Sequence, residues 1–259
     1  MNEFIVIVES NADARTATEL AERVLVENVE WLERDNLQYL FRWSGLQENT
    51  DNSCWKDIKK IIQNFQDTSQ FRPSRVLGKR RSNSTLLKAD GAAALKILNL
   101  VRFLQKERPI QAVLLIRDLD NQPERREGLE EARSQDLDRQ PKLEVILGTA
   151  NRMREAWVLN GFIPVNSQEE QLLAKIKQQL KFDPCTKSDK LRSTSREDRD
   201  RLRNPKVIVE QLTGQEMERE RQCWEETSLM ILRERGVETG LTDYIREIEE
   251  RLVPIICKS

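Results

Sequence analysis

The chain of 259 residues contains no histidine. This absence excludes the commonest general base, the commonest transition-metal ligand and every catalytic triad built on imidazole. Cysteine is also scarce, and the four residues form no CxxC pair, so we expect neither a zinc ribbon nor a disulfide framework but a reduced, cytoplasmic protein. The chemistry that remains belongs to carboxylates, lysine, arginine and hydroxyl groups.

Long apolar runs are missing as well. No stretch approaches the roughly 20 residues that a membrane-spanning helix needs, and the N-terminus lacks the layout of a signal peptide, so we expect no contact with a membrane. Charge of one sign is not in excess, since 43 Lys and Arg residues oppose 44 Asp and Glu residues. Any binding of nucleic acid must therefore depend on a local patch.

The most informative stretch is residues 110–124, IQAVLLIRDLDNQPE. The nearly continuous apolar run predicts a strand that is buried on both faces, in the centre of a parallel sheet. Asp118 and Asp120 follow at its carboxyl end, where open α/β sheets bind their ligands. Because residues i and i+2 of an extended segment point the same way, we expect the two carboxylates to converge on one point.

Apolar patterning along the rest of the chain alternates between strands and helices. We expect an α/β fold with a mostly parallel, doubly wound sheet, followed by a C-terminal helical appendage. The predicted strands are residues 3–8, 37–43, 76–78, 112–116 and 143–148. The predicted helices are residues 14–35, 54–65, 86–107, 123–135, 149–162 and 167–180. The predicted divisions are an α/β domain at 1–182, a polar linker or long loop at 183–205, and C-terminal helices at 206–259 that pack on the α/β body.

Acidic side chains follow several of the predicted strands. Glu9 ends the first strand, and Asp13 lies in the first turn of the helix that follows it. Together with Asp118 and Asp120 they form one predicted acidic rim, and Glu155 is placed to join it from the segment after the strand at 143–148. Carboxylates are the ligands that Mg²⁺ prefers, and such a cation can activate water for phosphoryl transfer without imidazole.

A strand that ends in VE, an acid four residues later and a second strand that ends in DxD resemble the TOPRIM domain of topoisomerases, bacterial primases and overcoming-lysogenization-defect (OLD) nucleases. ANRMREAWVLNGF, a polar linker and NPK resemble more closely the small stand-alone TOPRIM-like proteins related to the OLD nucleases, which often accompany ATPases in bacterial defence loci. The resemblance covers roughly residues 1–160, and more weakly the whole chain. It implies that a set of acidic side chains binds Mg²⁺ or Mn²⁺ and that four residues have a catalytic role. The implied metal ligands are Glu9, Asp13, Asp118, Asp120 and Glu155, and the implied catalytic residues are Glu9, Asp118, Asp120 and Lys206.

The function implied by the resemblance is a metal-dependent nuclease that cleaves DNA phosphodiesters as a subunit of a defence system. A local basic cluster is predicted to guide the DNA, and it consists of Arg72, Arg75, Lys79, Arg80 and Arg81. The alternative is a catalytically weak TOPRIM-fold module that regulates a partner ATPase. Ser10 favours this alternative mildly, because the family usually has glycine there and glycine lets the backbone approach a phosphate closely. The sequence leaves the oligomeric state open.

Each candidate also has a simpler interpretation. Acids at strand ends often cap the next helix or stay solvated, and Asp13 suits the first turn of a helix in any case. Glu155 has Arg152 and Arg154 nearby, so a surface ion pair explains it as well as metal binding does. The basic run at 72–81 is typical of a solvated loop. A receiver-like phosphoacceptor domain also has acids at strand ends, although no matching lysine follows a late strand here.

Overall fold

The computed structural model describes residues 1–72, 88–197 and 200–258, and it contains a central parallel sheet in the order β2-β1-β4-β5. The short β3 pairs with the end of β1 on the same side as β2. The strands are β1 (Asn2–Val8), β2 (Phe41–Ser44), β3 (Ser53–Cys54), β4 (Ile110–Asp118) and β5 (Glu144–Ala150). The predicted α/β class with a mostly parallel sheet is confirmed.

The register aligns the carboxyl ends of the central strands. Ile7 of β1 pairs with Leu115 of β4, and Asp118 at the end of β4 pairs with Ala150 at the end of β5. The residues that follow β1, β4 and β5 therefore meet along one edge of the sheet.

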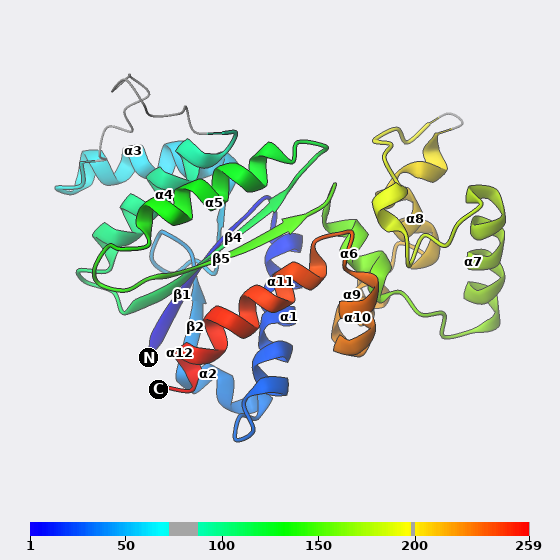
Figure 1. The fold of residues 1–259 in the computed structure, drawn as a ribbon, viewed down its shortest axis with the longest axis horizontal. Helices are drawn as coiled ribbons and strands as arrows, with labels where there is room; N and C mark the ends of the chain where they lie inside the picture. The colour runs from blue at the N-terminus through cyan, green and yellow to red at the C-terminus, as the bar shows by residue number, and fades with distance from the viewer. Residues whose placement is uncertain (73–87, 198–199, 259) are drawn as a thin grey trace.

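One face of the sheet is covered by three helices, which lie above the strands in Figure 1. The alternate residues Ile5, Ile7, Val113 and Leu115 point toward them and share a buried apolar core with them. The helices are α3 (Ile58–Thr68), α4 (Gly91–Leu104) and α5 (Glu124–Asp136).

The opposite face is covered by α1 (Asn11–Asn28) and by the C-terminal part of the chain (Figure 1). The strand residues Phe4, Val6, Leu114 and Ile116 belong to this second core. The remaining helices are α2 (Leu37–Leu40), α6 (Arg154–Gly161), α7 (Ser167–Leu180), α8 (Pro205–Leu212), α9 (Met217–Glu225), α10 (Leu229–Arg235), α11 (Leu241–Glu247) and α12 (Val253–Ile256). A π-helical segment, Ile248–Leu252, joins α11 to α12.

Two predicted elements near the N-terminus differ from the structure. Residues 37–40 form the helical turn α2, and only the last part of the predicted strand at 37–43 belongs to β2. The first helix ends at Asn28 rather than near residue 35, and Trp31 beyond it is exposed. The predicted strand at 76–78 lies outside the described residues.

The segment between residues 183 and 205 is not uniformly solvated. Cys185, Ser188 and Leu191 are buried, and two short 3₁₀ turns, Ser188–Lys190 and Arg201–Arg203, interrupt it. The sequence pattern does not indicate these contacts, because the buried side chains are isolated in a charged segment and show no helical or strand period. In the described part of the chain, no helix is long and apolar enough to cross a membrane.

Candidate functional site

Asp118 occupies the centre of the edge formed by the carboxyl ends of β1, β4 and β5. Its side chain follows Leu114 and Ile116 in the alternation of β4, so it points toward α1 and α6. The backbone N–H of Arg154, at the start of α6, donates to Asp118 Oδ1 at 3.0 Å. This hydrogen bond fixes the carboxylate between the end of β4 and the first turn of α6.

Two further predicted acids lie on this side of the sheet, beside a buried arginine. Arg154 Nε is 3.6 Å from Asp13 Oδ1, and Arg154 Nη2 is 3.6 Å from Glu155 Oε1. The same guanidinium is 2.7 Å from Glu220 of α9 and donates to Thr16 Oγ1 at 3.2 Å. We call Asp13, Asp118, Arg154 and Glu155 the α1-side group. Glu155 thus forms the ion pair with a neighbouring arginine that the simpler interpretation expected, but Arg154 is only 8 % exposed, so the pair is not a surface pair.

Ser10 also belongs to this side of the edge. Its hydroxyl donates to Asp13 Oδ2 at 2.7 Å, and its backbone is extended, with φ −150°. The position therefore places no steric demand for glycine on the chain, and serine adds a hydrogen bond that orients Asp13.

The other predicted acids lie on the opposite side of the sheet end. Arg117, next to Asp118 in β4, points toward α4. Its Nη1 is 2.8 Å from Glu9 Oε1, and its Nε donates to Asp90 Oδ2 at 2.8 Å. Arg125 of α5 lies 3.0 Å from Asp120 Oδ2 and donates to the backbone oxygen of Asp118 at 2.8 Å. We call Glu9, Asp90, Arg117, Asp120 and Arg125 the α4-side group.

An indole lies against one guanidinium of each group. The Arg117 guanidinium carbon is 5.3 Å from the ring centre of Trp55, and Trp55 Nε1 donates to the Ile116 oxygen at 2.7 Å. The Arg154 guanidinium carbon is 5.7 Å from the ring centre of Trp224. The arginines are thus held in place by rings as well as by acids.

Asp118 and Asp120 do not share one orientation, which corrects the expectation from their spacing. The extended backbone ends at Asp118, and Asp120 has φ 44° in the turn that follows. An i, i+2 relation brings side chains together only while the strand continues, so the carboxylate of Asp120 turns to Arg125 instead. The two acids are electrostatic neighbours that belong to different groups.

The electrostatics of the edge centre on Asp118. Burial raises the pKa of Asp118 well above its usual range, and the negative charges of Asp13, Glu155, Glu9 and Asp120 raise it further. Burial also raises the pKa of Glu9, against the opposing charge of Arg117. The other four predicted acids are therefore all close enough to Asp118 to act on its charge.

The five acids differ in how their charge is balanced. Glu9, Asp13, Asp120 and Glu155 each have an arginine within ion-pair distance. Asp118 has none among the residues that the structure describes. Within the same ranges, no three Asp, Glu or Cys side chains are grouped closely enough to hold one metal ion.

The chemistry of these donors nevertheless suits a hard cation. Asp118 is a half-buried carboxylate without a cationic partner in the described residues. Glu9 Oε1 is a buried oxygen whose neighbour Arg117 Nη1, at 2.8 Å, does not meet it in hydrogen-bond geometry. Oxygen donors of this kind bind Mg²⁺ or Mn²⁺.

The remaining predicted residues lie apart from these groups. Lys206 is an exposed residue in the first turn of α8, and no hydrogen bond or ion pair among the described residues joins its side chain to the acids. Arg72 is exposed, and its guanidinium donates to backbone oxygens at the end of α3, including that of Phe71 at 2.9 Å. Arg75, Lys79, Arg80 and Arg81 lie outside the described residues.

Sequence reasoning missed the arginines of the site and the acid Asp90. Arg117, Arg125, Arg154 and Asp90 are all within the network, yet none was predicted as a site residue. Arg117 had a local signal, since it directly precedes the DxD pair at the end of a buried strand. Asp90 acquires its role only through folding, because its partner Arg117 is distant in sequence, and Arg154 likewise reaches Asp13 and Glu220 only in the folded chain. Arg125 follows Asp120 by five residues, a spacing that by itself does not indicate an ion pair.

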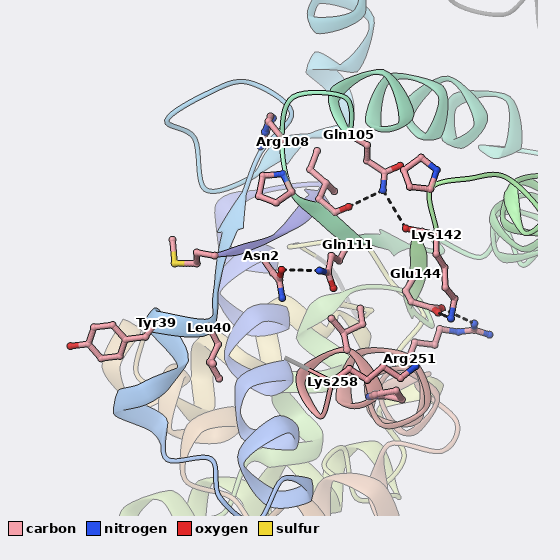
Figure 2. A pocket seen from close by; sticks show the side chains of 16 residues that line it. Asn2, Tyr39, Leu40, Gln105, Arg108, Gln111, Lys142, Glu144, Arg251 and Lys258 are labelled. Carbon is pink, nitrogen blue, oxygen red and sulfur yellow. Dashed lines mark hydrogen bonds and ion pairs between the residues drawn. The ribbon is translucent and has the colours of Figure 1, made fainter.

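A separate hollow of about 810 Å³ lies at the amino ends of the strands, on the opposite edge from Asp118 (Figure 2). Its polar side chains largely bind one another, as Lys142 and Glu144 do at 2.6 Å. It contains none of the predicted site residues, so the acidic edge remains the candidate functional site.

No protein-family model, curated protein or solved structure matches this chain. The resemblance to the TOPRIM family therefore stays a prediction from the sequence.

Proposed function

We propose that this chain is a divalent-metal-dependent nuclease of the TOPRIM type, which cleaves DNA phosphodiesters at the edge centred on Asp118. One observation carries the proposal. Asp118 is a half-buried carboxylate that has no cationic partner in the described residues, and four other carboxylates raise its pKa. A divalent cation relieves such repulsion more effectively than a singly charged guanidinium does.

The ligands in this proposal are the five acids of the two groups. Asp118, Asp13 and Glu155 would hold Mg²⁺ or Mn²⁺ on the α1 side, and Glu9 and Asp120 would hold it on the α4 side. A cation bound there supplies a water of lowered pKa and charge stabilisation at the phosphate.

The protein's own groups have definite tasks in this function. The backbone N–H of Arg154 orients Asp118 Oδ1, and the hydroxyl of Ser10 orients Asp13. Arg117 and Arg125 lie beside Glu9 and Asp120, where guanidinium groups can also contact phosphate oxygens in a bidentate manner. Binding of the cation to the carboxylates would release these arginines toward the substrate.

Mn²⁺ binding tests the proposal directly. We expect calorimetry to detect Mn²⁺ binding by the wild type, and Asp118→Asn to weaken it at least about 100-fold, since even residues behind the ligands typically contribute about 10–100-fold. Nicking of supercoiled plasmid in the same buffer should be lost in parallel. Glu130→Gln is the matched control, because Glu130 is a half-exposed acid of α5 that pairs with Arg126 outside both groups. A wild type that binds no Mn²⁺ at millimolar concentration would refute the proposal.

A second function is favoured by a different observation. Four of the five acids are already balanced by arginines in the structure. A fold that neutralises its own acids suits a regulatory module of an ATPase complex with little activity of its own. A folded wild type that neither binds Mn²⁺ nor nicks DNA, but associates with a partner ATPase, would establish this alternative.

A further inference from the structure

A cavity of about 500 Å³ lies next to the acidic edge. Its walls come from three parts of the chain: the loop after β4, the loop after β5, and residue 192 of the segment before α8. The polar residues that line it are Asn121, Gln122, Asn151, Arg152 and Arg192. The polar part of the lining is therefore made of amides and guanidiniums and, among the described residues, contains no acid.

Arg152 is the buried cation of this cavity. The residue is only 3 % exposed, and its backbone is left-handed, with φ 78°. Its two terminal nitrogens donate to the side-chain oxygen of Asn121 and to the backbone oxygen of Arg192, both neutral acceptors. Its Nε is buried and has no hydrogen-bond partner in the described residues. The guanidinium is thus held firmly without being neutralised.

The charge balance of the cavity is positive. Among the described residues, no carboxylate lies within ion-pair distance of Arg152 or of the exposed Arg192. Burial lowers the pKa of Arg152, the charge of Arg192 lowers it further, and Asp120 opposes the shift from a greater distance. A buried cation without a paired anion is costly, so this arrangement stabilises an anion that enters the cavity.

The position of the cavity connects it to the acidic edge. The backbone N–H of Asp120 donates to the backbone oxygen of Arg152 at 3.0 Å, and together with the Arg152–Asn121 hydrogen bond this joins the two loops. Asp120 and Asn121 are adjacent left-handed residues, and they turn their side chains to Arg125 and Arg152 respectively. An anion in the cavity would therefore lie beside the carboxylates that are proposed to bind the metal ion, but at a separate site.

We propose that this cavity binds a phosphate group of a nucleic-acid strand, with the guanidiniums of Arg152 and Arg192 as its cationic contacts. Planar guanidiniums match the oxygens of a phosphate, and the amides of Asn121, Asn151 and Gln122 supply neutral donors. The volume exceeds that of a single anion and suits a phosphate with its attached sugar. Naming a nucleic-acid strand rests on the proposed function; the phosphate site itself does not.

Fluorescence anisotropy with a short labelled single-stranded oligodeoxynucleotide, in metal-free buffer of low ionic strength, tests the site. We expect Arg192→Gln and Arg152→Gln each to weaken binding about tenfold or more, as for a charged hydrogen bond. The dependence of log affinity on log salt should become shallower by about one. Arg196→Gln is the matched control, because Arg196 is an exposed arginine of the same segment that pairs with Glu210 at 2.9 Å, and it should leave affinity nearly unchanged.

The exposed Arg192 decides the outcome if Arg152→Gln impairs folding, which a thermal melt of each variant reveals. Inorganic phosphate and a nucleoside monophosphate are titrated as competitors. If these bind in an Arg192-dependent manner while the oligonucleotide does not bind, the cavity takes a small phosphate compound rather than a strand. Unchanged binding of every probe in both variants would overturn the site. Because no metal is present, the result does not depend on Mn²⁺ binding or nicking, so this proposal and the nuclease proposal can fail separately.

Discussion

Asp118 is oriented by a backbone N–H rather than by a cation, and this has a consequence for stability. A carboxyl group whose pKa is raised by folding binds its proton more tightly in the folded state than in the unfolded state. Its contribution is therefore most favourable below the unfolded pKa of about 3.9, and stability declines as pH rises from there through the raised folded pKa. Glu9 shifts in the same direction, for the same leading reason of burial.

We expect Asp118→Asn to stabilise the metal-free protein at neutral pH. The amide keeps an oxygen to accept from the Arg154 N–H and removes the repelled charge. Thermal melts across pH 4 to 8 should show a higher midpoint for the variant and a weaker decline with pH, each kcal/mol gained adding about 2–4 °C. A variant that melts below the wild type at neutral pH would contradict this interpretation of the shift.

Helices α4 and α5 are joined by a buried ion pair. Arg102 of α4 is 7 % exposed and Asp136 of α5 is 1 % exposed. The Arg102 Nε donates to both carboxylate oxygens of Asp136, at 3.2 and 3.1 Å, and another nitrogen donates to the Pro141 backbone oxygen. Removing one partner of such a pair leaves the other as an isolated buried charge.

Asp136→Ala should therefore lower the free energy of unfolding by about 3–5 kcal/mol, measured by urea denaturation. Glu130→Ala, in the same helix, removes a half-exposed partner of Arg126 and should change it by at most about 1 kcal/mol. Equal effects of the two substitutions would show that the buried pair has no special role.

Elements with a single dominant signal were predictable from the sequence. The strands β1, β4 and β5 are continuous apolar runs, and Ser167–Leu180 has both a helical period and an Asn166 cap that accepts from the Glu169 N–H. Residues 37–43 were ambiguous because Leu37 and Leu40 fit a helical spacing as well as a strand. In the structure the exposed Tyr39 and buried Leu37 follow the helical turn.

The acids of the site were predictable because parallel strands end at one edge. Their partners were not, since Arg154 reaches Glu220 and Arg117 reaches Asp90 across elements far apart in the sequence. Long, flexible side chains contact such partners only after the helices have packed in the folded protein.

At the scale of the whole molecule, the C-terminal helices complete a core that begins with α1. Tyr244 of α11 donates to the Ala17 oxygen at 2.8 Å and stacks on Trp157 of α6, with ring centres 5.3 Å apart. Six buried residues of α11, the π-helical segment and α12 share the core with α1, namely Leu241, Tyr244, Ile245, Ile248, Leu252 and Ile256. At about 1.5–3 kcal/mol for each buried side chain, their contribution is comparable to the whole stability of a typical domain, about 5–15 kcal/mol.

We therefore expect a chain truncated to residues 1–204 not to fold. Circular dichroism should show no cooperative thermal transition, whereas removal of residues 257–259 alone should leave the transition close to that of the full chain. A cooperative transition of the shorter chain would show that the α/β part is independently stable.

The two indoles against the guanidiniums give the protein its own optical probes. Trp55 lies against Arg117 on one side of the edge, and Trp224 lies against Arg154 on the other. A ligand that displaces either arginine changes the polarity around one ring and therefore its fluorescence emission. Replacing one tryptophan at a time by phenylalanine would show on which face of the sheet a ligand arrives, without any attached dye.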